Sequence, residues 1–262
     1  MGRTASEWHS PPETVGLEVR RARLAWGNNL LLDDFSLSVP PGFWVCLLGE
    51  SGVGKTTLLR TIAGLVARAG PTEIEASDGS ALENRIAYMA QQDLLLPWLT
   101  AIDNVTLGAR LRGEPADLSR AADILDRTGV VERASALPSD LSGGERQRVA
   151  LARTLMEERP IVLMDEPFSA LDAITRARLQ ELAVELLDNR TVLMVTHDPF
   201  EALRLADSIT VLRGANAGGA ETVVAPEGAA PRDPTDPALR SAHNAIMQAL
   251  GGSSPETEGW AA

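Results

Sequence analysis

The segment from Gly49 to Thr56, GESGVGKT, constrains the fold more than any other stretch of this chain. It fits the pattern GxxxxGK[ST], and it stands between the apolar run FWVCLLG and a segment with helical spacing of apolar residues. The glycines let the backbone point its N–H groups at phosphate oxygens, at the positive end of a helix. Lys55 would reach the β and γ phosphates, and the hydroxyl of Thr56 would bind Mg²⁺.

An ordinary glycine-rich turn is the alternative, but it does not require a lysine and a threonine in this register. The sequence therefore predicts a loop that binds a nucleotide together with Mg²⁺. The residues predicted to hold the nucleotide here are Gly49, Ser51, Gly52, Gly54, Lys55, Thr56 and Thr57.

Four apolar runs predict the centre of a parallel sheet, because strands covered on both faces are apolar throughout. These runs are FWVCLLG, RPIVLMDEP, TVLMVTHD and DSITVLR. Two earlier stretches, LEVRRARLAW and FSLSV, alternate like half-exposed strands. Between the apolar runs, SRAADILDRTGVVERASALP and GERQRVALARTLMEER have helical spacing and are broken by Pro138 and by Gly143–Gly144. An α/β core with a helical insert at about 93–150 is the simplest architecture.

The two ends of the chain differ from this core. The first fifteen residues are rich in Ser and Pro and predict a disordered tail. Residues 214 to 237 are rich in Gly, Ala and Pro, and DPALRSAHNAIMQALGG then predicts one amphipathic helix. We therefore expect a tail at 1–15, a nucleotide-binding domain at 16–213, and a loop plus a C-terminal helix at 214–262.

Composition argues against several classes of partner. The net charge of -12 disfavours a surface for nucleic acid, which needs clustered Lys and Arg, and it also weakens adhesion to anionic lipid. No apolar run approaches the ~18 residues that predict a membrane span, so we expect no direct membrane insertion. Cys46 is the one cysteine of the chain, so there is no internal disulfide, and its apolar neighbours predict a buried strand residue instead of a reactive thiol.

Two successive carboxylates end the run IVLMDEP. Strand alternation directs Asp165 and Glu166 to opposite sides, so one can face a metal while the other faces a water. Asp165 would hold Mg²⁺, and Glu166 would polarise the water that attacks the γ phosphate. The alternative, a pair of helix caps or a solvated turn, is weakened by the phosphate loop in the same chain.

With LSGGERQRVALARTL, residues 141–155, the sequence resembles the ATP-binding subunits of ABC transporters over about residues 17–213. The other motifs of that family follow in order: GESGVGKTT, a glutamine in YMAQQDLLLPW, LSGGERQ, IVLMDEP, SALD, and His197 in VTHD. The resemblance implies an α/β P-loop NTPase core with a helical subdomain and a small antiparallel β subdomain. It also implies an ATPase that uses ATP and Mg²⁺.

The signature residues Ser142, Gly143 and Gly144 precede a helix, where a hydroxyl and free amides form a second anion site. One chain then carries two phosphate-binding surfaces, although a plain capping sequence would explain Ser142 alone. The resemblance resolves the surplus. It implies that two subunits pack head to tail as a homodimer, with the signature loop of one closing on the γ phosphate held by the other.

Four further residues take their expected roles from the resemblance. Gln91 aligns with the Q-loop glutamine better than Gln92, and it would approach Mg²⁺ and the attacking water. Asp172 would lie at the subunit interface, and His197 would bind the γ phosphate, although a lone histidine is more often structural. Trp26 would stack on adenine, with a structural tryptophan as the alternative.

The resemblance implies a bacterial-type importer subunit, peripheral on the inner face of the cell membrane through its permease. We expect integral-membrane permease subunits and a solute-binding protein as partners, and DLLLPWLTAIDNV either lines the permease groove or belongs to the core. LLPW and PFSALDAITR favour the nitrate, sulfonate, taurine and thiamine-precursor group, with hydroxymethylpyrimidine preferred. A soluble ABC ATPase of repair or translation and a P-loop kinase are the alternatives. The former usually has a coiled-coil insert or tandem cassettes, and the latter has no LSGGE.

Overall fold

A six-stranded sheet forms the centre of the structure, a computed structural model that describes residues 14–27, 29–68, 70–213, 220–225 and 227–250. The strand order is β5-β6-β7-β3-β8-β9, and all neighbours are parallel except β8 and β9. The strands are β3 (Trp44–Gly49), β5 (Ile86–Met89), β6 (Ile161–Asp165), β7 (Thr191–Thr196), β8 (Ser208–Leu212) and β9 (Ala220–Val224). The four apolar runs therefore form β3, β6, β7 and β8, as predicted.

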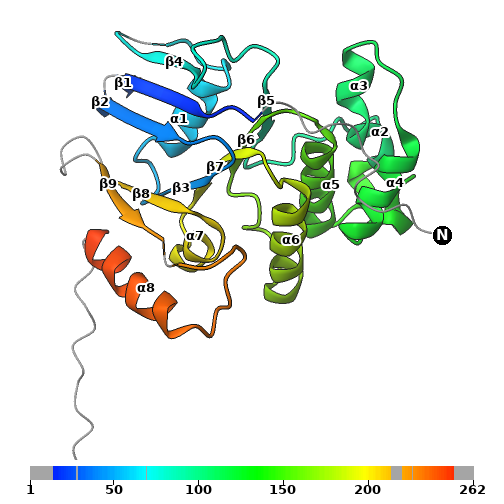
Figure 1. The fold of residues 1–262 in the computed structure, drawn as a ribbon. Helices are drawn as coiled ribbons and strands as arrows, with labels where there is room; N and C mark the ends of the chain where they lie inside the picture. Colours follow the sequence, from blue (N-terminus) through cyan, green and yellow to red (C-terminus); the bar gives the residue numbers. More distant parts are fainter. Residues whose placement is uncertain (1–13, 28, 69, 214–219, 226, 251–262) are drawn as a thin grey trace, which may run out of the picture.

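The predicted small antiparallel sheet is present beside this central sheet (Figure 1). Its order is β2-β1-β4, with β1 (Leu17–Trp26), β2 (Asn29–Val39) and β4 (Glu73–Ala76). The predicted fold, an α/β P-loop core with helical and small β parts, is confirmed.

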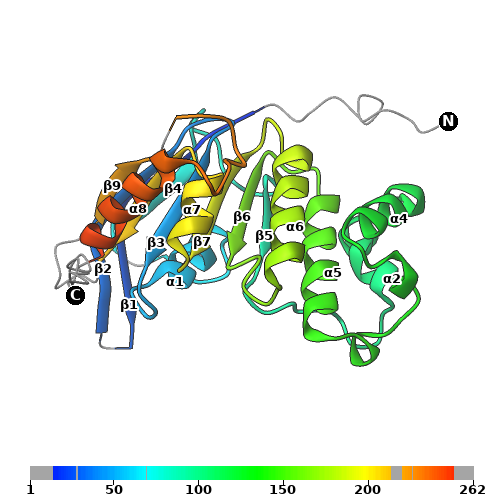
Figure 2. The ribbon, with the colours of Figure 1, turned by 90° about the horizontal axis from the view of Figure 1, so that it is seen from below.

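Helices cover both faces of the central sheet, and the helical insert projects from one end. Figure 2 shows α8, α7, α6 and α5 following one another across the molecule, with α2 and α4 beyond α5. The helices are α1 (Lys55–Ile62), α2 (Ala101–Val105), α3 (Leu107–Leu111), α4 (Leu118–Arg127), α5 (Gly143–Met156), α6 (Ala173–Leu186), α7 (Pro199–Leu205) and α8 (Pro237–Ala249). None of the helices in the described residues is long and apolar enough to span a membrane.

Strand β3 shows why continuous apolar runs form this core. Trp44, Cys46 and Leu48 pack against the helices α5 to α8, whereas Val45 and Leu47 pack against α1 and the small sheet. A strand with a cluster on each face needs apolar residues at every position, since alternate side chains point to opposite faces. Cys46 is fully buried, as predicted, and burial raises the pKa of its thiol.

The ends of the chain depart from the expectations in two places. Of the expected tail, residues 1–13 lie outside the described part, but Val15 is buried and its carbonyl accepts a 2.6 Å hydrogen bond from the hydroxyl of Thr191. The segment 214–237 was expected to be a loop, yet it contains β9, whose residues pair with β8. A short edge strand inside a Gly- and Ala-rich segment gives little periodicity to detect.

Candidate functional site

The phosphate loop opens into a cavity of about 520 Å³ beside the start of α1. Gly54 precedes α1 with φ 107°, a left-handed conformation that disfavours other residues. A Cβ atom at Gly49 would lie 2.5 Å from the carbonyl oxygen of Leu212, so β8 approaches too closely for a side chain. The cavity is lined by Asn29, Leu31, Ser51, Gly52, Gly54, Lys55, Thr56, Thr57, Arg60, Gln91 and Glu166.

Lys55 is buried beneath this loop with its ammonium group turned onto the loop backbone. Its Nζ donates to the carbonyl oxygens of Gly49 at 2.6 Å and Glu50 at 2.8 Å. Burial lowers the pKa of Lys55, and the charges of Glu166 and Asp165 act in the opposite direction. The lysine ammonium is a compact charge with three rotatable donors, so it can exchange backbone acceptors for phosphate oxygens.

Thr56 and Asp165 meet at the edge of the cavity. The hydroxyl of Thr56 donates to Oδ1 of Asp165 at 3.1 Å, and Oδ2 of this fully buried carboxylate has no partner in the described structure. Burial raises the pKa of Asp165, with the Thr56 hydrogen bond opposing the shift. An orphaned buried carboxylate oxygen beside a hydroxyl fits Mg²⁺, which binds one or two protein oxygens together with substrate phosphates. The described residues contain no group of three or more acidic, His or Cys side chains that could hold a metal ion.

Glu166 follows β6 in a left-handed conformation, with φ 49°. Its backbone N–H donates to the carbonyl of Val195 at 2.9 Å, and its carbonyl accepts from the hydroxyl of Ser169 at 3.0 Å. Such a conformation costs a non-glycine residue of order 1–2 kcal/mol and persists only where neighbours hold it. In the Glu166 carboxylate, Oε1 lies 3.1 Å from Nδ1 of His197, and Oε2 accepts a 3.3 Å hydrogen bond from Nε2 of Gln91.

The structure thus brings together most of the predicted site residues, and it favours Gln91 over Gln92. Both glutamines are exposed, but only Gln91 lines the cavity and contacts Glu166. Of the predicted site residues, those that line the cavity or contact a residue that lines it are Gly49, Ser51, Gly52, Gly54, Lys55, Thr56, Thr57, Gln91, Asp165, Glu166 and His197.

The signature residues lie elsewhere. Ser142 caps α5: its hydroxyl accepts from the N–H of Glu145 at 3.2 Å, and the Glu145 carboxylate accepts from the N–H of Ser142 at 2.7 Å. Ser142, Gly143 and Gly144 are not among the described residues that line the cavity at the phosphate loop, which we call the nucleotide cavity. The chain therefore carries this second helix start apart from its own phosphate loop.

Asp172 caps α6 by accepting from the N–H groups of Ile174 at 3.1 Å and Thr175 at 3.0 Å. The Thr175 amide lowers the pKa of the Asp172 carboxyl. Trp26 ends β1, but the prediction for its side chain falls outside what the structure describes.

The residues near the site that were not anticipated include Asn29 and Leu31, which line the cavity, and also Arg60, Gln147 and Arg176. Arg60 lines the cavity, and its position four residues after Thr56 on α1, hence on the same helical face, could have indicated this. Gln147 on α5 donates to the carbonyl of Pro167 at 2.9 Å, and Arg176 on α6 donates to the carbonyls of Phe168 and Leu171. These contacts leave no pattern in the sequence because their acceptors are backbone atoms.

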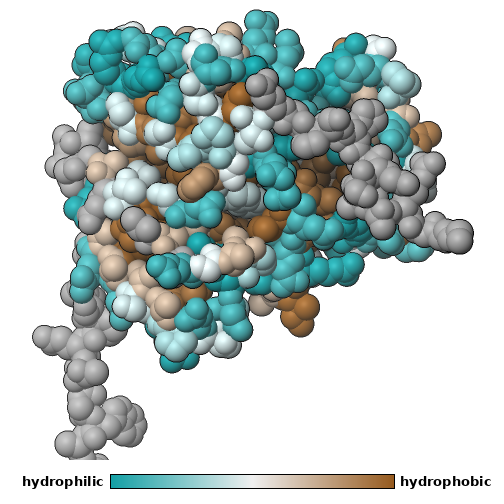
Figure 3. Space-filling model, in the orientation of Figure 1, coloured by the Kyte–Doolittle hydropathy of each residue, from teal (hydrophilic) through white to brown (hydrophobic). Residues whose placement is uncertain are grey.

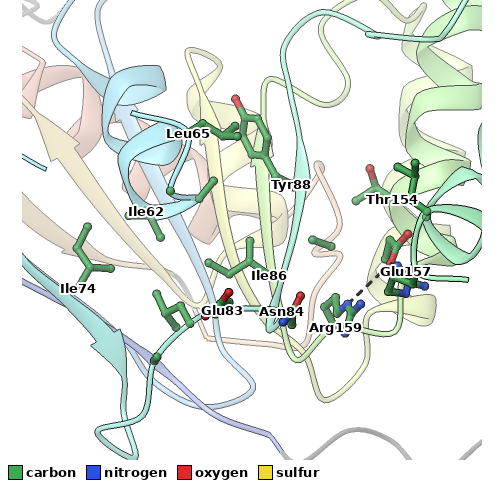
Figure 4. A pocket seen from close by; sticks show the side chains of 18 of the residues that line it. Ile62, Leu65, Ile74, Glu83, Asn84, Ile86, Tyr88, Thr154, Glu157 and Arg159 are labelled. Atoms are coloured by element: carbon green, nitrogen blue, oxygen red, sulfur yellow. Dashed lines mark hydrogen bonds and ion pairs between the residues drawn. The ribbon is translucent and has the colours of Figure 1, made fainter. Parts of the chain in front are cut away.

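A second, larger cavity of about 870 Å³ lies between α1, β5 and the helical insert (Figure 4). Its apolar lining includes Ile62, Leu65, Ile86 and Leu111, and Glu157 lies across it, 3.8 Å from Arg159. In Figure 3, apolar surface is visible between the strands and the helical insert. We refer to this cavity as the groove.

The segment 93–105 was expected to line a permease groove or to belong to the core, and none of its residues is among the described residues that line this cavity. Leu94 and Trp98 are exposed, whereas Leu95 is buried, so the segment contributes to both surface and core. It lies near the groove nonetheless, since Arg153, which lines the groove, donates to the carbonyls of Asp93 at 2.7 Å and Leu94 at 2.9 Å.

Comparison with known proteins identifies the family. The ABC transporter family model matches residues 32–169, more than half of the chain. The chain belongs to the ABC transporter family. This ABC subunit is 42% identical to an uncharacterized ABC transporter ATP-binding protein of Haemophilus influenzae, over 90% of this chain and 99% of the relative. It is 41% identical to an aliphatic sulfonates import ATP-binding protein of Paracoccus denitrificans, over 89% of this chain and 93% of the relative.

Solved structures agree with the family. An ATP-binding cassette solved as a dimer, in a post-hydrolysis state with ADP and Pi, superposes with a TM-score of 0.68 and 29% identity, covering 78% of this chain and 97% of that chain. The ABC subunit described here is accordingly an ATPase that uses ATP and Mg²⁺.

Proposed function

We propose that this chain is the ATP-hydrolysing subunit of an importer, and that two copies drive a membrane permease. The observation that carries the proposal is the convergence of Gln91 and His197 on the carboxylate of Glu166, in the cavity that also holds Lys55. The relatives named for aliphatic sulfonate import, 41% and 42% identical to this chain, support the importer assignment.

In this proposal Glu166 accepts a proton from the water whose oxygen attacks the γ phosphorus, and the bond between that phosphorus and the bridging oxygen of ADP breaks. Lys55 and the loop amides hold the β and γ phosphates, and Thr56 and Asp165 hold Mg²⁺. When bound, Mg²⁺ neutralises charge that develops on the phosphate oxygens. Gln91 orients the water. His197, whose Nδ1 faces Glu166, presents Nε2 to the γ phosphate.

The separation of the two anion-binding surfaces supports the proposed dimer. The start of α5 carries Ser142, Gly143 and Gly144 away from the chain's own cavity, so these groups serve the ATP held by a second copy. Asp172 would then lie at the interface between the copies, and Trp26 would stack on the adenine. The similar ATP-binding cassette was solved as a dimer with ADP and Pi, which supports this arrangement.

The groove is the proposed permease site. It is apolar along α1 and β5, and the ion pair of Arg112 with Glu157, at 2.7 Å, lies among its lining residues, so a short amphipathic helix of the permease would fit it.

The chain would then be cytoplasmic and peripheral to the inner face of the cell membrane. We assign residues 16–213 to the nucleotide-binding domain, with 93–150 as its helical subdomain; within the C-terminal segment 214–262, β9 adds an edge strand to its sheet.

For the cargo we propose an aliphatic sulfonate, delivered by a solute-binding protein. The names of the relatives support this choice over hydroxymethylpyrimidine or nitrate, and taurine falls within it as an aliphatic sulfonate.

Co-expression with the permease and membrane fractionation test the proposal. The subunit is expected in the membrane pellet only when the permease is present, and Leu111→Arg in the groove is expected to abolish this. Leu118→Arg is the matched control, because Leu118 is also an exposed leucine of the helical insert but does not line the groove. Phosphorylation of a small acceptor in solution, without membrane association, would refute the proposal in favour of a kinase.

A further inference from the structure

Arg176 on α6 contacts the two segments that carry Glu166 and His197, although it does not line the nucleotide cavity. Its Nε donates to the carbonyl of Phe168 at 3.3 Å, and its Nη2 donates to the carbonyl of Leu171 at 3.0 Å. The remaining nitrogen, Nη1, lies 3.8 Å from Oδ2 of Asp198. One guanidinium therefore joins the turn after β6 to the turn after β7.

The first of these turns carries the left-handed Glu166. Within it, the N–H of Ser169 donates to the carbonyl of Glu166, and the N–H of Leu171 donates to the carbonyl of Phe168. The ring of Phe168 is fully buried, so the turn is anchored at its centre. Arg176 adds donors to the carbonyls of Phe168 and Leu171 and so fixes the path of the backbone between Glu166 and α6.

The second turn carries His197. Asp198 caps α7 by accepting from the N–H of Phe200 at 2.9 Å and the N–H of Glu201 at 3.4 Å, and the same carboxylate faces Arg176. His197 in turn contacts the carboxylate of Glu166. The contacts close a ring that runs from Glu166 through His197, Asp198 and Arg176 back to the turn of Glu166.

Resting on the roles proposed above for Glu166 and His197, we propose that Arg176 is a positioning residue for ATP hydrolysis, which fixes the carboxylate of Glu166 and the imidazole of His197 relative to each other. The planar guanidinium presents donors in three fixed directions, which the ammonium group of a lysine does not. Arg176 acts on turns that hold the catalytic groups, and the phosphate loop that binds ATP lies outside its contacts. Its loss should therefore slow turnover and leave ATP binding unchanged.

The test measures kcat and KM for ATP in the full-length protein. Arg176→Met is expected to lower kcat by roughly 10- to 100-fold, the effect of a small misplacement of catalytic groups, with KM unchanged. The matched control is Arg204→Met. Arg204 of α7 contacts Glu181 of α6 at 3.0 Å, so it joins the same two helices without touching either turn. An equal loss of kcat in both variants, or a parental kcat in Arg176→Met, overturns the proposal.

Two milder variants keep the test valid if Arg176→Met folds poorly. Asp198→Asn retains a good helix cap but removes the charge that faces Arg176, and it is expected to lower kcat less than Arg176→Met does. Arg176→Lys retains the charge without the three-way geometry, and its kcat is expected to stay below the parental value. A parental kcat in Asp198→Asn refutes the link to His197, and a parental kcat in Arg176→Lys refutes the need for the guanidinium.

Discussion

Substitution of Glu166 by Gln isolates the proton acceptor of the proposed reaction. Glutamine keeps the shape of the side chain but cannot take a proton from water. It also cannot satisfy both neighbours as the carboxylate does, because the Nε2 group of Gln91 and a protonated Nδ1 of His197 both need an acceptor. Loss of a general base typically lowers the rate by ~10²- to 10⁴-fold. This is about 3 to 5 kcal/mol of transition-state stabilisation.

ATP binding should survive the substitution. Lys55 and the loop amides are unchanged, and removal of a negative charge from the cavity reduces repulsion of the triphosphate. With hydrolysis stopped and ATP retained, the closed dimer should accumulate. Size-exclusion chromatography with ATP and Mg²⁺ is expected to show a dimer for Glu166→Gln, and a phosphate-release assay is expected to show almost no turnover.

Glu201→Gln is the matched control, because Glu201 is a buried carboxyl on α7 that does not line the cavity. Its turnover should equal that of the parent protein. A Glu166→Gln protein that stays monomeric with ATP and Mg²⁺, or that hydrolyses ATP at the rate of the Glu201→Gln control, would refute the role given to Glu166.

Three further predictions concern the signature helix, pH and the metal. Ser142→Arg should leave ATP binding by the monomer intact but lower the hydrolysis rate by about 10²-fold or more, the scale for loss of a transition-state donor. The control Asp117→Arg removes the cap of α4 and should not lower the hydrolysis rate. Equal turnover of the two variants would contradict the two-chain site. Burial raises the pKa of Glu201, so the native state favours the protonated form, and this contribution to stability is present below the ordinary pKa and lost as pH rises through the raised one. Glu201→Gln should therefore raise the thermal midpoint at pH 8, by an amount that vanishes near pH 4, and a difference independent of pH would contradict this cause. Asp165→Asn should raise the thermal midpoint of the nucleotide-free protein, because it removes a buried charge whose Oδ2 has no partner in the described structure. It should also abolish the further rise in thermal midpoint that Mg²⁺ gives when ATP is present, as measured by calorimetry. An unchanged Mg²⁺ effect would exclude Asp165 as a metal ligand.

The centre of the fold could be predicted because buried parallel strands leave a pattern in the sequence. Residues such as Leu47 and Leu48 point to opposite faces, and both faces are covered, so neither can be polar. The phosphate-binding residues could be predicted for a similar reason. Lys55 and Thr56 must occupy fixed places after the glycines if phosphate and metal are to be reached.

Other features depend on contacts between distant segments and could not be predicted. The left-handed conformation of Glu166 is set by Val195 and Ser169. Arg176 and Gln147 act on backbone carbonyls, which every residue has, so no residue type marks the partner. The contact between Gln91 and Glu166 also joins distant segments, although the resemblance to the family had already favoured Gln91 over Gln92.

Helix α1 belongs to both cavities of the molecule. Lys55, its first residue, lies in the nucleotide cavity, and Ile62, its last, lines the groove. Its eight residues span only about 12 Å. Two ligands that prefer different placements of one short rigid element are thermodynamically linked. Whatever factor ATP imposes on the affinity of the groove for its occupant, that occupant must impose on the affinity for ATP.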